Sequence, residues 1–105
     1  MTVALQNFGS LEAKNKIAIL GDMFELGDEA NKEHQNIEAL INTLNIPEAI
    51  FIGEHFHKAL SSSSNKTFRT FDAFKNQFDI HGFKNATILI KGSRGMALER
   101  VLELL

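Results

Sequence analysis

Four short segments rich in apolar and β-branched residues give this chain its pattern. They lie at residues 16–20, 49–52, 67–71 and 86–90. Ile17 to Leu20 are continuously apolar, without alternation, which is typical of a strand covered on both faces. Each segment is only four or five residues long and lies between turn-forming or polar residues. These segments therefore predict four β-strands.

The stretches between these segments carry apolar residues at helical spacing. Residues 28–44 place theirs three or four apart, which predicts a helix with one buried face, begun by Asp28 or a neighbour. Shorter helices are predicted over residues 2–8, 54–60 and 72–78, and a last one over residues 96–105. The buried face of that last helix is expected to hold Leu98, Val101, Leu102 and Leu105.

One helix followed by four strand–helix units predicts an α/β protein. We expect a Rossmann-like, three-layer α/β/α fold with a mainly parallel sheet of about four strands. Right-handed crossovers favour the strand order 3-2-1-4. In that order the winding reverses between strands 1 and 4, and ligands of open α/β sheets bind beyond the strand ends at such a point. The predicted crevice has an acidic wall, with Asp22 and Glu25, and a basic wall, with Lys91, Ser93 and Arg94.

Composition narrows the class of protein. A chain of 105 residues with 44% apolar content is expected to form a single domain, residues 1–105, with a real core. A net charge of −2 gives no electrostatic reason to expect nucleic acid or an anionic membrane as the partner. The absence of cysteine excludes disulfides and thiolate metal sites. The apolar runs are too short to span a bilayer.

The basic segment Lys91-Gly92-Ser93-Arg94-Gly95 joins the fourth strand to the predicted last helix. Its two glycines would let the backbone approach a ligand, and the free N–H groups of a helix start favour an anion. An arginine can hold a carboxylate or a phosphate through two hydrogen bonds, and a serine can donate one. We predict anion binding here. The simpler alternative is a helix start flanked by two solvated cations.

The acidic segment leaves two interpretations of Asp22 open. Its carboxylate could orient a cationic or amine-bearing ligand, or Arg94 itself, or it could accept hydrogen bonds from N–H groups of the surrounding loops. Glu25 and Asp28 are expected in turn formation and helix capping. His34 lies on the apolar stripe of its helix and is expected to be partly buried and hydrogen-bonded, the alternative being that it faces the site. The remaining histidines lack the further ligands of a metal site.

Several catalytic motifs are missing from the sequence. It contains no G-x-x-x-x-G-K-[ST] segment, and no G-x-G-x-x-G segment follows the first strand. These absences argue against a P-loop and weaken a dinucleotide-binding interpretation. No set of residues resembling a Ser-His-Asp or Cys-His arrangement can be identified either. We therefore expect no catalytic residue and no metal ligand in this domain.

The two junctions, in this order, resemble the C-terminal domain of the Mur ligases. The resemblance is carried by Lys16 to Gly27, Glu33-His34, Phe51 to Glu54, Leu89 to Met96 and Leu98-Glu99, and it extends over residues 2–105. Two of these stretches, G-D-M-x-E-L-G and K-G-S-R-G-M, form a specific pair. Within the family, the residues are similar to the branch that adds D-alanyl-D-alanine to UDP-N-acetylmuramoyl-tripeptide.

The resemblance implies a three-domain, ATP-dependent enzyme of cytoplasmic peptidoglycan synthesis that works through an acyl phosphate. It implies that ATP and Mg²⁺ are bound mainly by a central domain, which this chain is expected to lack together with the N-terminal UDP-sugar domain. The partners would be that central domain, ATP, the UDP-linked tripeptide and the dipeptide. Alone, the C-terminal domain is expected to be inactive and to hold no cofactor.

The resemblance also assigns roles to residues. Lys91, Ser93 and Arg94 would hold the dipeptide carboxylate or approach the ATP phosphates, with Gly92 and Gly95 as backbone contacts. Asp22 would orient the dipeptide or the closed domain interface. Two other classes remain open: a stand-alone Rossmann-like module that binds a small anionic ligand, and a structural or regulatory domain acting through protein contacts.

Overall fold

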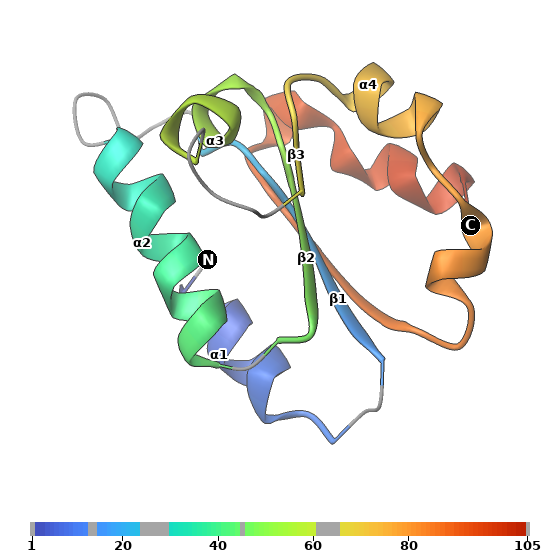
Figure 1. The fold of residues 1–105 in the computed structure, drawn as a ribbon, viewed down its shortest axis with the longest axis horizontal. Coiled ribbons are helices and arrows are strands. Elements are labelled where there is room, and N and C mark those ends of the chain that lie inside the picture. Colours follow the sequence, from blue (N-terminus) through green and yellow to red (C-terminus); the bar gives the residue numbers. More distant parts are fainter. Residues whose placement is uncertain (1, 13–14, 24–29, 45, 61–65, 105) are drawn as a thin grey trace.

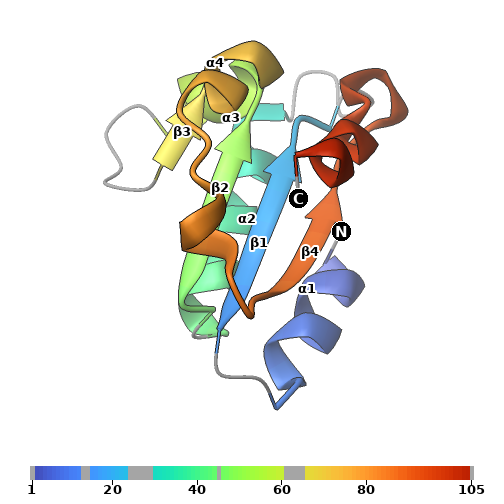
Figure 2. The same cartoon turned by 90° about the vertical axis from the view of Figure 1, so that its right-hand side faces the viewer.

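The computed structural model of the chain contains one four-stranded sheet, in which all strands are parallel and follow the order β3-β2-β1-β4 (Figure 2). The predicted order is confirmed. The structure describes residues 2–12, 15–23, 30–44, 46–60 and 66–104. The strands are β1 (Lys16–Gly21), β2 (Glu48–Ile52), β3 (Lys66–Phe68) and β4 (Thr87–Lys91).

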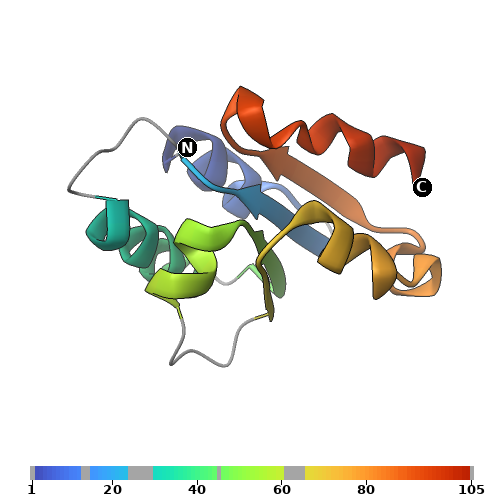
Figure 3. The ribbon, with the colours of Figure 1, turned by 90° about the horizontal axis from the view of Figure 1, so that it is seen from above.

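Helices cover both faces of the sheet, which confirms the three-layer α/β/α architecture (Figures 1 and 3). One face carries α1 (Thr2–Ser10), α2 (Ala30–Thr43) and α3 (Glu54–Ala59). The other face carries α4 (Phe71–Asn76) and three short 3₁₀ helices, η2 (Ile80–Phe83), η3 (Arg94–Met96) and η4 (Leu98–Glu103).

Strand β1 shows why the first apolar run lacks alternation. Ala18 and Leu20 pack into the core beneath α1, α2 and α3, whereas Ile17 and Ile19 pack into the core beneath α4 and η4. Successive side chains of a strand point to opposite faces, so a strand between two covered faces must be apolar at every position. Ile19 pairs with Ile50 of β2 and Ile90 of β4, which places β1 at the centre of the sheet.

Two glycines bring the ends of β1 and β4 together. A Cβ on Gly21 would lie 2.7 Å from Cδ1 of Leu98, and a Cβ on Gly92 would lie 3.1 Å from Cα of Gly21. The two strand ends therefore approach backbone to backbone, beneath the side chain of Leu98. This contact sets the loops that follow β1 and β4 side by side, as the strand order predicted.

The prediction of a single last helix over residues 96–105 was wrong. Ala97 has a left-handed backbone, with φ of 49° and ψ of 44°, which separates η3 from η4. Leu98 and Val101 are buried and Leu104 packs against the same core, so the apolar spacing is three, as in a 3₁₀ helix. Leu102, expected on the buried face, is 64% exposed.

Smaller differences concern where elements begin and end. The predicted third strand over residues 67–71 ends at Phe68, because α4 already begins at Phe71. Thr70, and not Asp72, caps α4, since the Thr70 side chain accepts a hydrogen bond of 3.1 Å from the Ala73 N–H. Helix α1 continues to Ser10. The predicted helix start at Asp28 lies outside the described residues.

Candidate functional site

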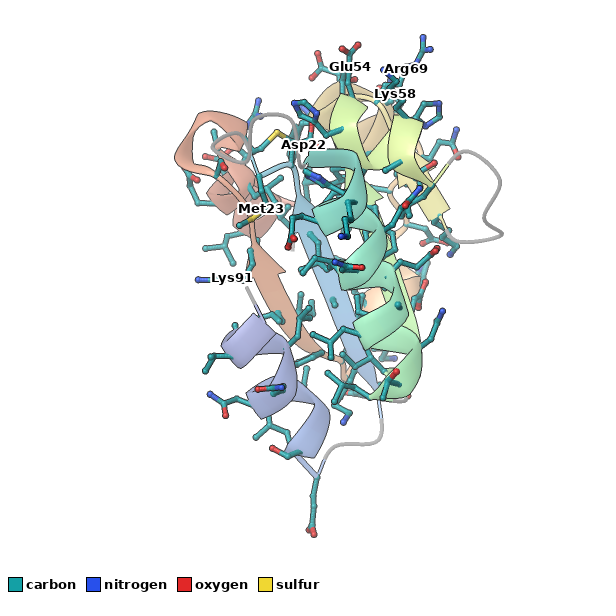
Figure 4. The ribbon with its side chains drawn as sticks, turned by 90° about the vertical axis from the view of Figure 1, so that its left-hand side faces the viewer. Asp22, Met23, Glu54, Lys58, Arg69 and Lys91 are labelled. Atoms are coloured by element: carbon teal, nitrogen blue, oxygen red, sulfur yellow. The ribbon has the colours of Figure 1, made fainter. Side chains whose placement is uncertain are left out.

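A pocket of about 300 Å³ lies at the carboxyl edge of the sheet. Its lining comes from the ends of three strands and from the turn after the fourth: Asp22, residues 53–55, residues 69–71, Gly95 with Met96, and Arg100. Ligands of open α/β sheets bind at this edge. Figure 4 shows Glu54, Lys58 and Arg69 grouped above Asp22 at this end of the molecule.

Asp22 lies at the floor of this pocket and is only 2% exposed. Its Oδ2 accepts a hydrogen bond of 2.9 Å from the His55 N–H, and its Oδ1 accepts one of 2.9 Å from the Phe56 N–H. The carboxylate thus serves N–H groups of the first turn of α3, which is the second of the two interpretations of this residue. Its contact with a substrate stays a prediction.

Gly53 makes room for that carboxylate. Its φ of 129° is a conformation that side-chain-bearing residues rarely adopt, and a Cβ at this position would overlap the carboxyl group of Asp22. The Gly53 N–H donates a 2.7 Å hydrogen bond to the Phe68 carbonyl, which ties the turn after β2 to the end of β3. The walls of the pocket are therefore joined to one another through backbone contacts.

His34 of α2 is fully buried behind Asp22. Its Nε2 accepts a 3.1 Å hydrogen bond from the Met23 N–H, so this nitrogen carries no proton. The 4.0 Å separation between this Nε2 and Oδ1 of Asp22 is then a contact between two acceptors and not an ion pair. The His34 ring also meets the edge of Phe56 at 4.3 Å between centroids. Its hydrogen-bonded, buried state agrees with the sequence-based expectation.

The basic junction lines a different pocket. Lys91, Gly92 and Ser93 border a hollow of about 390 Å³ that η4 closes with Leu98, Glu99 and Leu102. Among the described residues, this hollow shares no lining residue with the pocket above Asp22. Figure 4 shows Lys91 well away from Glu54 and Arg69. The two junctions still meet, because the Ser93 N–H donates a 3.0 Å hydrogen bond to the Asp22 carbonyl.

The structure leaves part of the predicted crevice without a description. Glu25 lies outside the described residues, and only the backbone of Arg94 is described, within η3. The expected helix start after Gly92 is a three-residue 3₁₀ turn followed by the left-handed Ala97. Such a turn lacks the aligned peptide dipoles on which the anion-binding argument was based. Gly92 and Gly95 remain candidate backbone contacts, each in its own pocket.

Two arginines that line the pocket were not predicted as site residues from the sequence. Arg69 directly follows β3, and it lines both the pocket above Asp22 and an adjoining hollow of about 390 Å³ that also holds Glu54, His57 and Lys58. The rule that ligand-binding side chains follow strand ends could have found Arg69. Sequence spacing gives no comparable indication for Arg100, which belongs to η4.

Arg100 is held in place by three contacts. Its Nε and one terminal nitrogen donate hydrogen bonds of 2.9 Å and 2.8 Å to the carbonyls of Ala97 and Met96. Its guanidinium carbon lies 4.1 Å from the ring centroid of Phe71, within cation–π distance. The positive charge at this side of the pocket is therefore fixed by the fold.

Within the described ranges, no group of three histidine or acidic side chains is arranged to hold a metal ion. No described helix is long and apolar enough to cross a membrane.

Comparison with known proteins gives related sequences. No protein-family model matches the chain. The UDP-N-acetylmuramoyl-tripeptide--D-alanyl-D-alanine ligase of Buchnera aphidicola is 33% identical over 96 residues, which cover 84% of this chain and 20% of that protein. The ligases of the same name from Rickettsia prowazekii and Treponema pallidum are 28% and 30% identical, over 98% and 100% of this chain and 24% of each relative.

The chain spans about a fifth to a quarter of the length of the curated relatives it matches. Its parallel sheet of order 3-2-1-4 is the Rossmann-like fold that the resemblance to the family implied. In sequence the chain thus resembles MurF, the ligase named for all three relatives, and its fold is the one expected for the C-terminal domain of the Mur ligases.

Proposed function

We propose that this chain is the acceptor-binding and closure domain of a ligase that adds D-alanyl-D-alanine to UDP-N-acetylmuramoyl-tripeptide. One observation carries the proposal: three curated ligases of that name match 84% to 100% of the chain. UDP-linked precursors and ATP are cytoplasmic compounds, so we place the protein in the cytoplasm. The step belongs to peptidoglycan biosynthesis.

The chemistry of the step follows from its substrates. ATP transfers its γ-phosphoryl group to the terminal carboxylate of the tripeptide and leaves as ADP. The amine of the dipeptide attacks the resulting acyl phosphate, and the tetrahedral intermediate expels inorganic phosphate while the nitrogen loses a proton. An amide bond has then replaced the acyl–phosphate bond. The contribution of this chain is to hold the dipeptide with its amine toward the acyl phosphate and to exclude water, which competes as a nucleophile.

ATP and Mg²⁺ are assigned to a central domain outside this chain. The sequence carries no P-loop, and the described residues offer no set of metal ligands. Mg²⁺, when bound, neutralises charge on the transferred phosphoryl group. This chain alone should therefore release no phosphate from ATP in the presence of dipeptide. Appreciable dipeptide-dependent phosphate release by the purified chain would contradict this assignment.

The pocket above Asp22 suits the dipeptide. D-alanyl-D-alanine is a small zwitterion, and a volume of about 300 Å³ is at the lower end of the range for small-ligand pockets. The pocket offers Arg69 and Arg100 for a carboxylate and Glu54 for an ammonium group. We propose that the dipeptide carboxylate lies toward Arg69. This assignment is based on the presence of both positively and negatively charged side chains in one small pocket.

The separate position of Lys91 favours its second predicted role. Lys91 and Ser93 lie in the hollow bordered by η4, apart from the pocket with Arg69. We propose that these two residues approach the ATP phosphates when the domain closes, since a lysine suits a phosphate as a point charge. Arg94 keeps both predicted roles, as carboxylate or phosphate contact.

A chimeric enzyme tests these assignments. This chain would replace the matching region of the Rickettsia ligase, and amide formation would be followed while each substrate is varied. We expect an ATP- and dipeptide-dependent product. Losing a charged hydrogen bond costs about 1.5–3 kcal/mol, so Arg69→Ala should raise the KM for the dipeptide by about tenfold or more. Lys91→Ala should instead raise the KM for ATP.

The matched control is Lys75→Ala, an exposed lysine on α4 that lines neither the pocket above Asp22 nor the hollows that hold Lys58 and Lys91. It should leave both KM values unchanged. An active chimera whose Arg69→Ala and Lys91→Ala variants keep unchanged kinetics would overturn the two residue assignments. A folded chimera with no ligase activity would count against the proposed function itself.

The alternative function is a stand-alone module for a small anionic ligand. It is favoured by one observation: residues of this chain bring two arginines, Arg69 and Arg100, to one pocket. Chemical-shift mapping of the chain with inorganic phosphate, ATP and D-alanyl-D-alanine separates the two functions. Selective binding of the dipeptide supports the ligase domain, whereas binding of phosphate alone supports the anion module. Shifts that cluster away from both junctions would exclude the pocket.

A further inference from the structure

Asp22 and the next residue connect four elements of the fold. The Asp22 N–H donates a 3.1 Å hydrogen bond to the Ile52 carbonyl at the end of β2. The carboxylate accepts hydrogen bonds from the first turn of α3, and the carbonyl accepts one from Ser93 in the turn after β4. The Met23 N–H then donates to His34 of α2. Every polar atom of Asp22 has a protein partner.

These partners are the supports of the pocket walls. His55, whose N–H donates to Oδ2 of Asp22, lines the pocket together with Glu54. Ser93, held by the Asp22 carbonyl, belongs to the turn that leads to Gly95 and Met96 on the opposite wall. The distance between the two walls is therefore set through one residue. A buried carboxylate with two N–H donors in place is also difficult to rotate, because each lost bond leaves a buried group unpaired.

We propose that Asp22 is a positioning residue that fixes the α3 turn relative to the turn after β4, and that it does not itself bind the acceptor. Its link to the acceptor rests on the proposed function, but its role as a connection between the two turns does not. The carboxylate is 3% exposed, and Gly53 brings its backbone against it from the α3 side. The dipeptide therefore meets Glu54 and Arg69 rather than Asp22.

The hydrogen bond from the Ser93 N–H to the Asp22 carbonyl makes the proposal testable. Replacing Asp22 by asparagine changes the carboxylate but leaves the backbone carbonyl that Ser93 uses. If the carboxylate only capped α3, the Asp22→Asn variant would alter the His55 and Phe56 amides and leave Ser93 unchanged. If it positions both turns, the Ser93 amide must respond as well. Amide hydrogen exchange of the 105-residue chain measures all three groups.

In Asp22→Asn we expect exchange at His55, Phe56 and Ser93 to rise by about tenfold relative to Leu20 and Phe51, which report global unfolding. The matched control is Asp79→Asn, the same substitution at a carboxylate that accepts from the His81 N–H and caps η2 away from the pocket. It should accelerate exchange only near His81. An unchanged Ser93 in Asp22→Asn would overturn the proposal.

A measurement on the unsubstituted chain decides the question if the variant does not fold. Groups held by one residue should open together. The opening equilibrium constants of the His55, Phe56 and Ser93 amides should therefore agree within about twofold. Ser93 exchanging about a hundredfold faster than the other two would show that the turns move independently. That result would also overturn the proposal.

A titration with D-alanyl-D-alanine separates this inference from the proposed function. Upon binding, the Cγ signal of Asp22 should stay in place while amides of residues 53–55 and 69–71 shift. A Cγ shift as large as theirs would identify Asp22 as a direct ligand and overturn the positioning role. Absence of any dipeptide binding would count against the proposed acceptor site, while the exchange results would still decide the role of Asp22.

Discussion

Each end of β1 carries a buried charged residue that holds a helix end in place. The two charges have opposite signs, and their surroundings differ in how strictly the geometry is fixed. At the start of the strand, Lys16 is 8% exposed, and its Nζ donates to the carbonyls of Phe8, Gly9 and Leu11 at the end of α1. At the other end, Asp22 accepts from N–H groups at the start of α3. A cation at a helix end and an anion at a helix start both match the helix dipole.

The difference between the ends lies in how tightly each charge is held. Lys16 reaches three acceptors through a flexible four-carbon chain, at 2.9 to 3.3 Å, and none of the three residues that supply those carbonyls has a positive φ. Asp22 has a short side chain and requires a glycine with φ of 129° beside it. We infer that the amino edge of β1 anchors a helix, whereas the carboxyl edge sets a geometry. Four substitutions test this difference between the two ends of β1.

The largest effect is expected for Gly53→Ala. The new Cβ would overlap the Asp22 carboxyl group in a backbone conformation that alanine adopts with strain. Strain and the displaced hydrogen bonds together should lower the free energy of unfolding by about 4 kcal/mol, measured by urea denaturation. Gly82→Ala is the control, because a Cβ there meets nothing within 4 Å. Equal stability of the two variants would contradict the steric account of Gly53.

Asp22→Ala should follow, with a loss of about 3 kcal/mol, because the His55 and Phe56 N–H groups lose their acceptor in a buried place. Glu54→Ala, at the exposed neighbour on the same turn, should change stability by no more than about 0.5 kcal/mol. Urea denaturation of both variants gives the comparison. A loss below that of the lysine variant described next would reverse the proposed contrast.

Lys16→Met should cost about 2 kcal/mol. Methionine keeps most of the buried side chain but leaves three carbonyls at the end of α1 without the Lys16 ammonium donor. Because this helix end lies near solvent, water can replace part of the lost hydrogen bonding. The same denaturation experiment, with amide exchange in α1, measures the effect. Lys75→Met, at an exposed position, is the control and should be nearly neutral. Unchanged exchange at residues 5–8 would show that Lys16 does not anchor the helix.

The smallest effect is expected for Asp79→Ala, at about 0.5 kcal/mol. Asp79 caps η2 through a 3.0 Å bond to the His81 N–H, and it is exposed, so water replaces the lost acceptor. Thermal unfolding of this variant beside Asp22→Ala compares one residue type in two surroundings. A loss as large as that of Asp22→Ala would mean that burial is not what makes the Asp22 carboxylate important.

The fold could be read from the sequence because few arrangements bury these residues. The apolar run of β1 demands cover on both faces, and right-handed crossovers then leave few strand orders. The position of Lys91 could be anticipated only in part. In β4, Leu89 packs beneath α1 to α3 and Ile90 packs beneath η4, so alternation assigns Lys91 to the face of Leu89. The structure places Lys91 at the border of the hollow that η4 lines, which alternation does not predict.

Other parts of the site depend on contacts that sequence spacing does not encode. Nothing in an alanine signals the left-handed backbone of Ala97, which ends η3 and gives Arg100 two carbonyl acceptors. The place of Arg100 over Phe71 joins segments 29 positions apart in the numbering, and only the packed fold brings them together. Gly53 directly follows the second predicted strand, but its need for φ of 129° arises from the carboxylate it faces, which sequence spacing does not encode.

Glycines at positions 21, 53 and 92 give this domain an unusual mutational signature. At positions 21 and 53 the first carbon of any side chain would strike Leu98 or Asp22, and at position 92 it would press tightly against the backbone of β1. In a saturation-mutagenesis screen for the proposed ligase activity, these three positions should rank among the least tolerant, beside residues that contact substrate. None of them offers a side-chain group to the chemistry. A ranking by intolerance alone would therefore mistake the sites where backbone segments touch for sites that bind ligand.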